Sequence, residues 1–598
     1  MKKLLLTYQQ RNLKNTTKNN MAELDKNAIL NADKWLNSSI SEEIKKQILS
    51  LKENNIEEFN DAFYKTMAFG TGGLRGIMGI GTNRMNTIVV SMSTQGFANY
   101  IKEQNKDKQE IKVVVSFDSR NNSKDFATIT AKVFAANGFK VYLFENIHPT
   151  PLLSFAVREL QCDAGVMLTA SHNPKEYNGY KAYWNDGGQL VFPHDENVIK
   201  EVNEITDISQ VKLQENMDGI TILSDDFDNI YFEKIKTLSL AEEGLEKYKD
   251  IKIVYTPLHG TGFRIVPQAL NLFGFKDVIS EPQQSIPDGN FPTTVSPNPE
   301  EKAALDLGLK LMEKENADIL LATDPDADRE ALTIRDNNGN LMLLNGNQTA
   351  TLISYYLLCR WQELGKLTGK EFIIKTIVSS ELIKVLADKY NVKCYDVLTG
   401  FKWIADKILE KEGKEQYIGG GEESYGYLIG DFVRDKDSVS TCCIIAEMCA
   451  WAKMHNKTIY DILLELYAEF GYYQEGLVSV VRKGKTGAEE IQAMMDMFRN
   501  NPPTTLIGQK IVKINDYELQ ISKDLTNNTT NKLDLPQSNV LQFFLEDGSK
   551  ISVRPSGTEP KIKFYFGVRS EFKKGDDFKA LLEKSEQKIE DIKKELNL

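Results

Sequence analysis

Short apolar runs alternate with helix-length amphipathic segments along most of this chain. The runs at 111–117, 164–168 and 317–323 have the length of buried strands, and polar residues rich in glycine or proline follow each one. Amphipathic segments such as 124–137 and 402–411 predict helices between such runs. This alternation of strand and helix predicts α/β units whose sheets have parallel character.

The alternation occurs three times, so we predict three consecutive α/β domains with βαβ-rich, mixed sheets. In such sheets ligands bind beyond the carboxyl ends of the strands. The predicted strands are 111–117, 140–144, 164–168, 251–255, a strand near Val278, 317–323, 372–378, 392–397 and 416–418. The predicted helices lie within 27–65 and at 124–137, 149–160, 262–273, 299–314, 380–390 and 402–411.

The C-terminal part has a different pattern, which predicts an α+β domain. A hairpin spans 540–553 around Asp547-Gly548, a strand follows at 561–568, and an amphipathic helix begins at about residue 577. The polar stretch 524–537 predicts a mobile loop.

Composition changes this picture mainly by excluding partners. The chain has 598 residues, of which 41% are hydrophobic and 26% charged, as is usual for a globular protein. Its net charge of −12 argues against non-specific binding to nucleic acid or to an anionic membrane. A locally positive cleft for an anionic substrate remains compatible with this charge.

The cysteines and the N-terminus indicate a cytoplasmic protein without a membrane span. Six cysteines occur without a Cys-x-x-Cys pair, which predicts reduced thiols. No histidines pair at metal-ligand spacing, and no apolar run is long enough to cross a membrane. Residues 1–20 contain no acidic residue, and we expect them to be disordered. Met21 opens a more protein-like sequence and is a candidate start; a transit peptide is the alternative.

The stretch Thr169-Ala-Ser-His-Asn-Pro174 is the first candidate for chemistry. It follows the predicted strand 164–168 and precedes a second turn signal at Asn178-Gly179. A loop of this kind can hold Ser171 forward into a cleft, where we hypothesise that it carries a phosphoryl group. The alternative is that its Ser and Asn side chains only cap a turn.

A glycine-rich segment, 69–79, surrounds the single cation Arg75. Glycine lets the backbone approach an anion closely and tolerates positive φ. The segment is therefore a candidate anion site, and a plain flexible turn is the alternative.

Three aspartates follow the predicted strand 317–323. Asp324, Asp326 and Asp328 alternate along the chain, so their carboxylates can converge on one hard cation. The pattern is not an EF-hand, because that motif requires glycine where Arg329 stands. Three carboxylates with open coordination positions suit Mg²⁺ that also binds phosphate, and the adjacent arginine suits other phosphate oxygens. A solvated acidic turn is the alternative.

Two further loops carry sugar- and phosphate-type donors. In Gly421-Glu-Glu-Ser424, Glu422 and Ser424 face the same side if the segment is extended, and together they could read vicinal sugar hydroxyls. A tight glycine turn is the alternative there. The second loop, Arg554 to Lys561, predicts a phosphate nest whose alternative is an ordinary loop. Its donors are Arg554, Ser556, Gly557, Thr558 and Lys561.

The four motifs together resemble the α-D-phosphohexomutase superfamily, because they occur in that family's order. The motifs are Thr169-Ala-Ser-His-Asn-Pro174, Asp324-Pro-Asp-Ala-Asp-Arg329, Gly421-Glu-Glu-Ser424 and Arg554-Pro-Ser-Gly-Thr-Glu559. The resemblance implies four domains around a central cleft, a phosphoserine, Mg²⁺, a small-molecule phosphosugar substrate and a glucose 1,6-bisphosphate intermediate. For the assembly state, we leave a monomer and a weak homodimer open.

The resemblance further assigns a role to each matched residue. Ser171 is the phosphoryl carrier and, with Asp324, Asp326 and Asp328, a Mg²⁺ ligand. The catalytic group also contains Arg75, Lys181 as the leading general base, and His172 as an alternative base. Substrate-binding residues are Arg329, Thr399, Gly400, Glu422, Ser424 and Lys436, and Arg554, Ser556, Gly557, Thr558 and Lys561 bind phosphate.

One departure bears on the substrate. Many family members that act on mannose have a histidine two residues after the reader serine, whereas this chain has Gly426. We therefore expect a phosphoglucomutase, resembling the bacterial α-phosphoglucomutase and phosphoglucomutase-2/phosphopentomutase branch. Phosphomannomutase, phosphopentomutase or sugar-bisphosphate synthase activity, a metal phosphatase and a non-catalytic phosphosugar-binding protein are the alternatives. The second phosphate site argues against a simple phosphatase.

We predict domain boundaries from the same pattern. A disordered extension covers 1–20. Domain I, 21–212, holds the phosphoserine loop, and domain II, 213–338, holds the Mg²⁺ loop. Domain III, 339–470, carries the sugar-binding loop, and domain IV, 471–598, carries the phosphate-binding loop.

Overall fold

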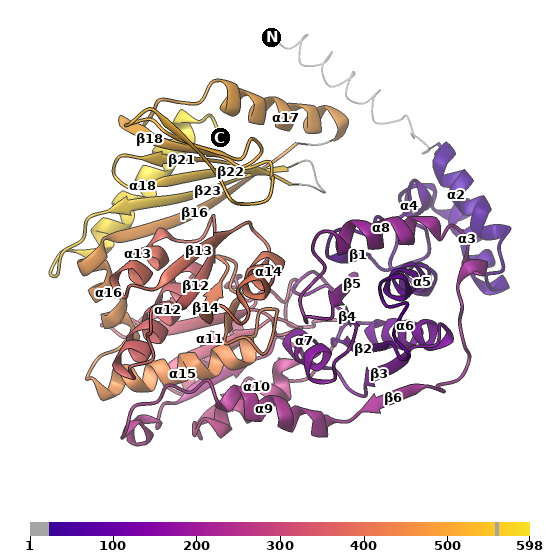
Figure 1. The fold of residues 1–598 in the computed structure, drawn as a ribbon, viewed down its shortest axis with the longest axis horizontal. Coiled ribbons are helices and arrows are strands. Elements are labelled where there is room, and N and C mark those ends of the chain that lie inside the picture. The colour runs from indigo at the N-terminus through magenta and orange to yellow at the C-terminus, as the bar shows by residue number, and fades with distance from the viewer. Residues whose placement is uncertain (1–22, 483, 557–560) are drawn as a thin grey trace, which may run out of the picture.

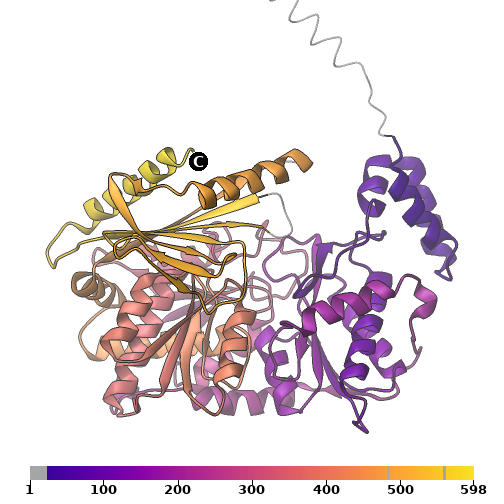
Figure 2. The same ribbon diagram turned by 45° about the horizontal axis from the view of Figure 1, so that its top comes forward.

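The computed structural model describes residues 23–482, 484–556 and 561–598, so the predicted extension 1–20 lies outside the described residues. Four sheets follow one another along the chain and form an arc (Figure 1). The first sheet and the C-terminal sheet lie at the two ends of the arc, as Figure 2 also shows. The predicted fold class, three α/β domains followed by an α+β domain, is confirmed.

The first sheet has six strands in the order β1-β5-β4-β2-β3-β6. The strands β4, β2, β3 and β6 run parallel, whereas β1 and β5 pair antiparallel at one edge. The strands are β1 (Gly73–Ile77), β2 (Lys112–Phe117), β3 (Lys140–Phe144), β4 (Ala164–Leu168), β5 (Tyr177–Trp184) and β6 (Ile220–Leu223). The helices are α2 (Lys26–Leu36), α3 (Glu42–Asn54), α4 (Ile56–Phe63), α5 (Thr87–Gln104), α6 (Ser123–Ala136), α7 (Thr150–Glu159), α8 (His194–Glu204) and the short η1 (Ile208–Gln210).

The second sheet has the strand order β11-β10-β9-β7-β8, with β9, β7 and β8 parallel. Its strands are β7 (Ile253–Thr256), β8 (Val278–Ser280), β9 (Ile319–Thr323), β10 (Glu330–Arg335) and β11 (Leu341–Leu343). Its helices are η2 (Asp225–Phe227), α9 (Asp228–Lys236), η3 (Leu245–Tyr248), α10 (Gly262–Leu272) and α11 (Asp306–Lys314).

The third sheet has the order β13-β12-β14-β15, in which only β15 is antiparallel. Its strands are β12 (Glu371–Thr376), β13 (Lys393–Val397), β14 (Gln416–Gly421) and β15 (Tyr427–Ile429). Its helices are α12 (Gly346–Glu363), α13 (Glu381–Lys389), α14 (Phe401–Lys411), α15 (Ser438–Met454) and α16 (Ile459–Phe470).

The C-terminal sheet is antiparallel, in the order β16-β23-β22-β21-β18-β19-β20, and β17 pairs with β18. Its strands are β16 (Tyr472–Val481), β17 (Thr505–Leu506), β18 (Gln509–Asp516), β19 (Ile521–Asp524), β20 (Thr529–Lys532), β21 (Leu541–Leu545), β22 (Lys550–Pro555) and β23 (Lys561–Ser570). Helices α17 (Gly484–Asn500) and α18 (Phe578–Glu595) complete it.

Two sequence predictions about elements were wrong. The helix predicted over 299–314 begins only at Asp306, because tertiary contacts hold the preceding residues in turns: Glu300 pairs with Arg329, and Ala304 O accepts from Gln284. The stretch 524–537 is not only a loop, since β20 pairs with β19 across a turn in which Asp524 accepts four hydrogen bonds from Thr526 and Asn527.

Two strands also extend their sheets past the boundaries set from the sequence. β6 joins the first sheet although it lies beyond residue 212, and β11 joins the second although it lies beyond residue 338. Local sequence did not reveal these short edge strands, because their residues are exposed or only partly buried.

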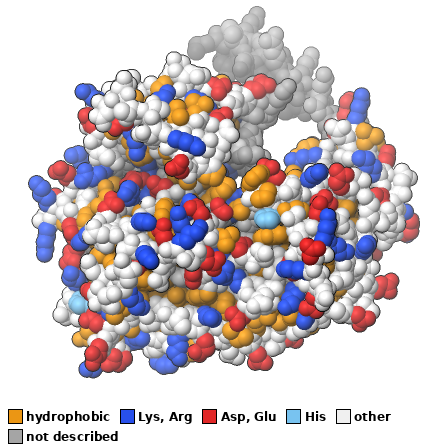
Figure 3. All heavy atoms as spheres, viewed as in Figure 1, with side chains coloured by type: hydrophobic (Ala, Val, Ile, Leu, Met, Phe, Trp, Pro, Cys, Tyr) orange, Lys and Arg blue, Asp and Glu red, His pale blue; other side chains and the backbone are white. Residues whose placement is uncertain are grey.

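Helix α15 of the third domain is buried along nearly its whole length. Its side chains are buried from Ser438 through Ala452, so it is enclosed on all sides by the largest apolar core. The six cysteines are free thiols, four of them buried. Among the described residues, no helix is long and apolar enough to cross a membrane. Acidic and basic side chains are interspersed on the face drawn in Figure 3.

Candidate active site

Ser171 lies at the carboxyl end of β4, buried, with a backbone φ of 52°. This left-handed conformation is uncommon for a residue with a side chain, and functional sites often retain it. Thr169 Oγ1 accepts from the Ser171 amide at 2.8 Å, and the Ser171 hydroxyl donates to Asp324 Oδ2 at 2.7 Å. The structure therefore brings the predicted carrier serine and one predicted metal ligand, 153 residues apart, into direct contact.

The serine loop is held in place by Arg120, which follows β2, the strand next to β4 in the sheet. Its guanidinium donates to the carbonyls of Ser171, Asn173, Pro174 and Tyr177. Arg120 is ion-paired with Asp118, and neither side chain is exposed. A planar guanidinium with five donors suits this task, because one residue can bind several carbonyls around a turn.

Arg75 enters the site through β1, which pairs with β5 so that Arg75 lies opposite Gly179. A Cβ at residue 179 would lie 2.5 Å from the Thr169 carbonyl oxygen and 2.8 Å from that of Leu74. Glycine there allows β1 and the serine loop to approach from both sides. Arg75 is exposed and lies within electrostatic reach of Asp324, Asp326 and Asp328.

The aspartate loop lies between β9 and β10, which form an antiparallel pair, and three domains hold it. Thr150 of the first domain donates to Asp326 through both its amide and its hydroxyl, each at 2.8 Å. The Thr261 amide of the second domain donates to the Pro325 carbonyl, and Ser438 of the third donates to that of Ala327. The loop is thus placed where the first three domains meet.

The aspartate cluster has the chemistry of a divalent-cation site. Ligand oxygens of Asp324, Asp326 and Asp328 all lie within 4.8 Å of one another, and all three residues are buried. Asp326 Oδ1 and Asp328 Oδ1 are buried and have no hydrogen-bond partner within the part of the chain that the structure describes. Burial and the two neighbouring carboxylates raise the pKa of Asp324 well above its usual range. A hard cation would satisfy the unpartnered oxygens and relieve the repulsion between the carboxylates, so the residues fit Mg²⁺.

The two predicted bases differ in their charge. Burial opposes charge on Lys181, but Asp326 and Asp328 outweigh burial and raise its pKa; its ammonium donates to them at 2.7 and 3.0 Å. Burial and nearby Arg329 lower the pKa of His172 to about 2, so its imidazole is neutral and weakly basic. His172 Nδ1 lies 3.2 Å from Ser171 Oγ. In this arrangement Lys181 is a cation, and His172 is a neutral neighbour of the serine.

Lys436 contacts the same oxygen of Asp328 as Lys181 does. Its ammonium contacts Asp328 Oδ2 at 3.0 Å and Asp435 Oδ1 at 3.1 Å. Asp435 also accepts from the Tyr183 hydroxyl at 2.7 Å and from Gln189 at 2.9 Å, both in the first domain. The loop after β15 is therefore fixed to the strand β5 that carries Lys181.

The predicted sugar-binding residues meet at the end of β14. Glu422 Oε1 accepts from the Gly400 amide at 3.1 Å, which joins two loops that are separate in sequence. Thr399 precedes that amide and, like Ser424, is partly exposed. Residues 423–425 form a bend rather than an extended segment, so the predicted alternation of faces does not apply. Burial raises the pKa of Glu422 to about 7, with Lys436 opposing the rise.

Arg329 lies within electrostatic reach of Glu422 in this sugar-binding region. Its guanidinium donates to Glu300 at 2.7 Å, and that glutamate belongs to the turn segment predicted as a helix. Burial opposes charge on Arg329, but Asp328 and Glu300 outweigh it and raise its pKa. The arginine is a cation between the aspartate loop and the sugar-binding loop.

The C-terminal sheet supplies more cations from the opposite end of the arc. Gly557 and Thr558 of the predicted phosphate nest lie outside the described residues, and the Ser556 amide donates to the Lys561 carbonyl at 2.8 Å. Arg554 on β22 lies opposite Lys563 on β23. Burial, together with the charges of Lys561 and Arg554, lowers the pKa of Lys563. We call Arg554, Lys561 and Lys563 the domain IV cation cluster.

Several site residues were missed by sequence reasoning. Arg120 follows a strand in the same way as the named motifs, so its position was a usable signal. The alternation of Lys561 and Lys563 with apolar residues on β23 was also visible and indicated a shared face. Asp435 and Glu300 carried no local signal, because their roles depend on residues more than 20 positions away.

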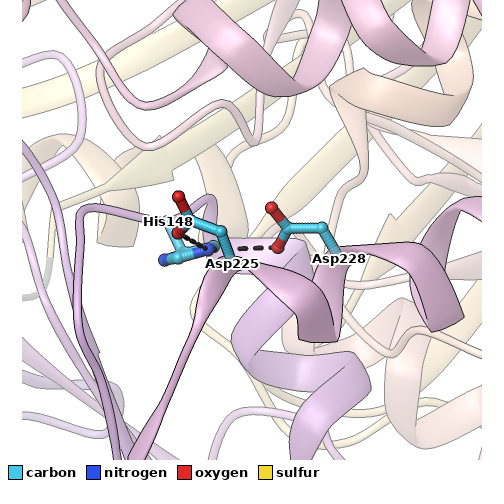
Figure 4. Close-up of side chains that lie close together, drawn as sticks. All are labelled: His148, Asp225 and Asp228. Carbon is cyan, nitrogen blue, oxygen red and sulfur yellow. Dashed lines mark hydrogen bonds and ion pairs between the residues drawn. The ribbon is translucent and has the colours of Figure 1, made fainter.

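A second group of metal-type ligands lies outside this site. His148 Nε2 is 3.1 Å from Asp228 Oδ1 and 3.6 Å from Asp225 Oδ1 (Figure 4). Arg264 already neutralises both carboxylates, with nitrogens 3.2 Å from Asp225 and 2.6 Å from Asp228. The His148 ring also bonds to the Asn146 carbonyl. The group is therefore an ion network that joins the first two domains.

The chain matches four descriptions of one protein family. The phosphoglucomutase/phosphomannomutase alpha/beta/alpha domains I, II and III match residues 66–209, 229–339 and 345–470, and the C-terminal domain of that family matches residues 479–594. Together the four matches cover most of the chain.

Curated relatives share more than a third of their residues with this chain. It is 37% identical over 522 residues to a phosphoglucomutase of Staphylococcus haemolyticus (strain JCSC1435), covering 87% of this chain and 94% of the relative. It is 36% identical over 552 residues to a phosphoglucomutase of Staphylococcus saprophyticus, covering 90% and 96%.

Solved structures share the fold. The open form of the Paramecium phosphoprotein pp63/parafusin, a phosphoglucomutase, matches with a TM-score of 0.64 at 18% identity, covering 89% of this chain and 96% of that one. A phosphoglucomutase/phosphomannomutase family protein of Burkholderia thailandensis matches with a TM-score of 0.63 at 16% identity, covering 88% and 97%.

Proposed function

The chain belongs to the phosphoglucomutase/phosphomannomutase family, whose enzymes are isomerases of the phosphotransferase type, and from this premise we propose its reaction. It interconverts α-D-glucose 1-phosphate and glucose 6-phosphate through a phosphorylated Ser171 and glucose 1,6-bisphosphate. The observation that carries the proposal is the contact between Ser171 Oγ and Asp324 at 2.7 Å, inside a buried cluster of three aspartates. The curated relatives that bear the name phosphoglucomutase support glucose as the sugar.

Asp324, Asp326 and Asp328 would hold Mg²⁺ together with the Ser171 side chain. When bound, Mg²⁺ supplies positive charge that stabilises the phosphoryl group during transfer. The chain's own cations contribute to the same end. Arg75 and Arg329 lie beside these carboxylates, where they can bind phosphoryl oxygens.

The reaction consists of two phosphoryl transfers. The 6-hydroxyl oxygen of glucose 1-phosphate attacks the phosphorus on Ser171; a bond forms to O6, the bond to the Ser171 oxygen breaks, and the hydroxyl proton leaves. The bisphosphate turns round in the cleft. The Ser171 hydroxyl then attacks the phosphorus at C1, which releases glucose 6-phosphate and restores the phosphorylated serine.

The chain must hold the sugar while either end reacts. Glu422 and Ser424 bind hydroxyls of the sugar, and the domain IV cation cluster binds the phosphate that is not being transferred. Lys563 and Tyr565 of domain IV lie within electrostatic reach of Glu423, next to the hydroxyl reader, which supports the proposal that the two binding groups serve one substrate. A phosphosugar held in this way presents its free hydroxyl to Ser171.

The proton of the attacking hydroxyl needs an acceptor. His172 is too weak a base, because its pKa is lowered to about 2. Lys181 remains our candidate. The carboxylates that raise its pKa are the ones proposed to bind a divalent cation, and a bound cation would offset their negative charge and so lower the pKa of Lys181. The Lys181 ammonium would otherwise act as a positioned cation.

The test compares glucose, mannose and ribose 1-phosphates as substrates, with Mg²⁺ and trace glucose 1,6-bisphosphate, for the wild type and Ser171→Ala. We expect fastest turnover of the glucose compound and its loss in the variant, with a phosphorylated Ser171 peptide in the wild type by mass spectrometry. Preference for mannose or ribose would keep the mechanism and change the substrate. Binding without turnover of any of the three would overturn the mutase proposal in favour of a binding protein.

A further inference from the structure

The contact between domain III and domain IV contains a buried lysine that the proposed reaction does not use. Lys550, at the start of β22, is 4% exposed. Its ammonium donates to the Ile377 carbonyl at 2.8 Å and to the Ser379 carbonyl at 3.1 Å, and it forms an ion pair with Glu381. All these acceptors lie in residues 376–381 of domain III, which we call the bridging turn.

The groups that surround Lys550 at this interface also have partners of their own. Glu381 also binds Lys375, at 3.0 Å, and Lys375 binds Asp396 at 2.8 Å. Gln542 of domain IV donates to the Ile377 carbonyl at 2.6 Å. An ammonium with three protein acceptors in a buried interface has few alternative arrangements, so it fixes the position of β22 relative to the bridging turn.

The bridging turn also supports the sugar-binding loop. The Thr376 hydroxyl donates to Glu423 Oε2 at 2.9 Å, and Glu423 is the residue next to the hydroxyl reader Glu422. Thr376 Oγ1 is held in turn by the Ser379 amide at 3.2 Å. One short segment of domain III is thus bonded on one side to the sugar-binding loop and on the other to domain IV.

The strand β22 carries the connection to the phosphate side. Lys550, Ser552 and Arg554 alternate along it and share one face of the sheet. Arg554 lies four positions after Lys550, which is about 13 Å along an extended strand. Because β22 is paired on both sides, with β21 and β23, it transmits the position of Lys550 to Arg554 as a rigid element.

We propose that Lys550 is a positioning residue that sets the separation between the sugar-binding loop and the domain IV cation cluster, and thereby the size of sugar phosphate that the enzyme prefers. The inference rests on the proposed function and deepens it. A phosphosugar held at both ends fits only where the hydroxyl readers and the phosphate-binding cations lie one sugar length apart. A fixed separation selects between hexose and pentose phosphates, and a loosened one selects less.

The main variant is Lys550→Met, which keeps the length of the side chain and removes its ammonium. The matched control is Lys588→Met. Lys588 lies in the same domain and contacts Asp547, Ser549 and the Arg569 carbonyl, so its described contacts all stay within domain IV. Both variants are assayed with glucose 1-phosphate and ribose 1-phosphate beside the wild type.

We expect Lys550→Met to lower kcat/KM for the preferred sugar about 10-fold or more, since displacement of a binding group by about 1 Å can cost up to 100-fold. The ratio of kcat/KM for glucose 1-phosphate to kcat/KM for ribose 1-phosphate should change at least 5-fold, in the direction of one. Phosphorylation of Ser171, measured by mass spectrometry, should not change, because Lys550 does not contact that site. Lys588→Met should leave the sugar ratio at the wild-type value.

A purely structural role would lower activity with both sugars by the same factor, and that outcome would overturn the inference while the proposed function stands. Absence of turnover in the wild type would overturn the proposed function itself, and the inference with it. Should Lys550→Met fail to fold, Thr376→Val cuts the other half of the bridge without removing a charge. An unchanged sugar ratio in a folded Thr376→Val protein counts against the proposal in the same way.

Discussion

Gly426 and Lys436 occupy adjoining space: a Cβ added at Gly426 would lie 2.1 Å from Lys436 Cδ and 2.9 Å from its Cγ. The middle of the Lys436 side chain therefore passes where any side chain at residue 426 would stand. Its ammonium reaches Asp328 beyond, at 3.0 Å. Glycine at 426 is thus the condition for Lys436 to reach the aspartate loop, and any side chain at that position would exclude this arrangement.

Gly426→Ala should displace Lys436 from Asp328 and lower kcat/KM at least 10-fold, because no side-chain conformation of the lysine avoids a contact of 2.1 Å without moving its middle carbons. The control is Gly567→Ala, where an added Cβ meets its nearest atom at an ordinary 3.8 Å. A double-mutant cycle with Lys436→Ala should be strongly non-additive, since both changes remove the same cation. Additive losses in kcat/KM would contradict the steric explanation.

Binding of Mg²⁺ should release a proton. Burial and the neighbouring carboxylates raise the pKa of Asp324, so part of the metal-free protein is protonated there, and a cation must displace that proton. The affinity for Mg²⁺ should therefore fall as the pH falls. Calorimetry in two buffers of different ionisation enthalpy measures the release directly. Asp324→Asn should bind more weakly and release no proton.

Asp225→Asn provides the matched control for this experiment. Asp225 belongs to the other group of metal-type ligands, in which Arg264 already neutralises the carboxylates. The Mg²⁺ affinity and the proton release should not change in this variant. Loss of Mg²⁺ binding in Asp225→Asn would show that the wrong aspartate cluster had been assigned to the metal.

The positions of the site loops were largely predictable from the sequence, whereas their partners were not. Apolar runs with polar residues after them placed Ser171, Asp324 and Glu422 at strand ends, because a buried strand needs a local run of apolar residues. The contact of Lys436 with Asp328 depends on packing between different domains, and no local pattern encodes it. The hairpin β19–β20 was missed for a related reason, since the side chains of β20 are exposed and show no apolar alternation.

Binding of the sugar should strengthen as the pH rises through about 7. Burial raises the pKa of Glu422 to about 7, and the ionised carboxylate is the better acceptor for sugar hydroxyls. KM for the sugar phosphate should fall over this range in the wild type and change less in Glu422→Gln. Both proteins share the ionisation of the substrate phosphate near pH 6, so the difference between their profiles isolates the carboxyl group.

The raised pKa of Glu422 also predicts that the stability of the fold falls as the pH rises, whereas sugar binding strengthens. A carboxyl whose folded pKa is raised above its unfolded value favours the protonated fold, so its contribution to stability is lost as the pH rises from about 4.5 to 7. Glu422→Gln cannot lose that contribution. Relative to the wild type, the variant should gain thermal stability between pH 5 and pH 8, and a constant difference between the two would argue against the shifted pKa.

Arg120→Met should strongly destabilise the serine loop. The ion pair of Arg120 with Asp118 is fully buried, and removing one partner of such a pair costs about 3–5 kcal/mol because the other charge is left unpaired. The variant also removes the donors to four loop carbonyls. Hydrogen exchange at residues 169–177 should therefore accelerate, and the phosphorylated fraction of Ser171 should fall.

The double variant Asp118→Asn/Arg120→Met should recover part of the lost stability, because it removes the unpaired charge. It should not recover the protection of the loop from exchange. Equal stability of the single and double variants would mean that the buried charge is not the cause of the loss.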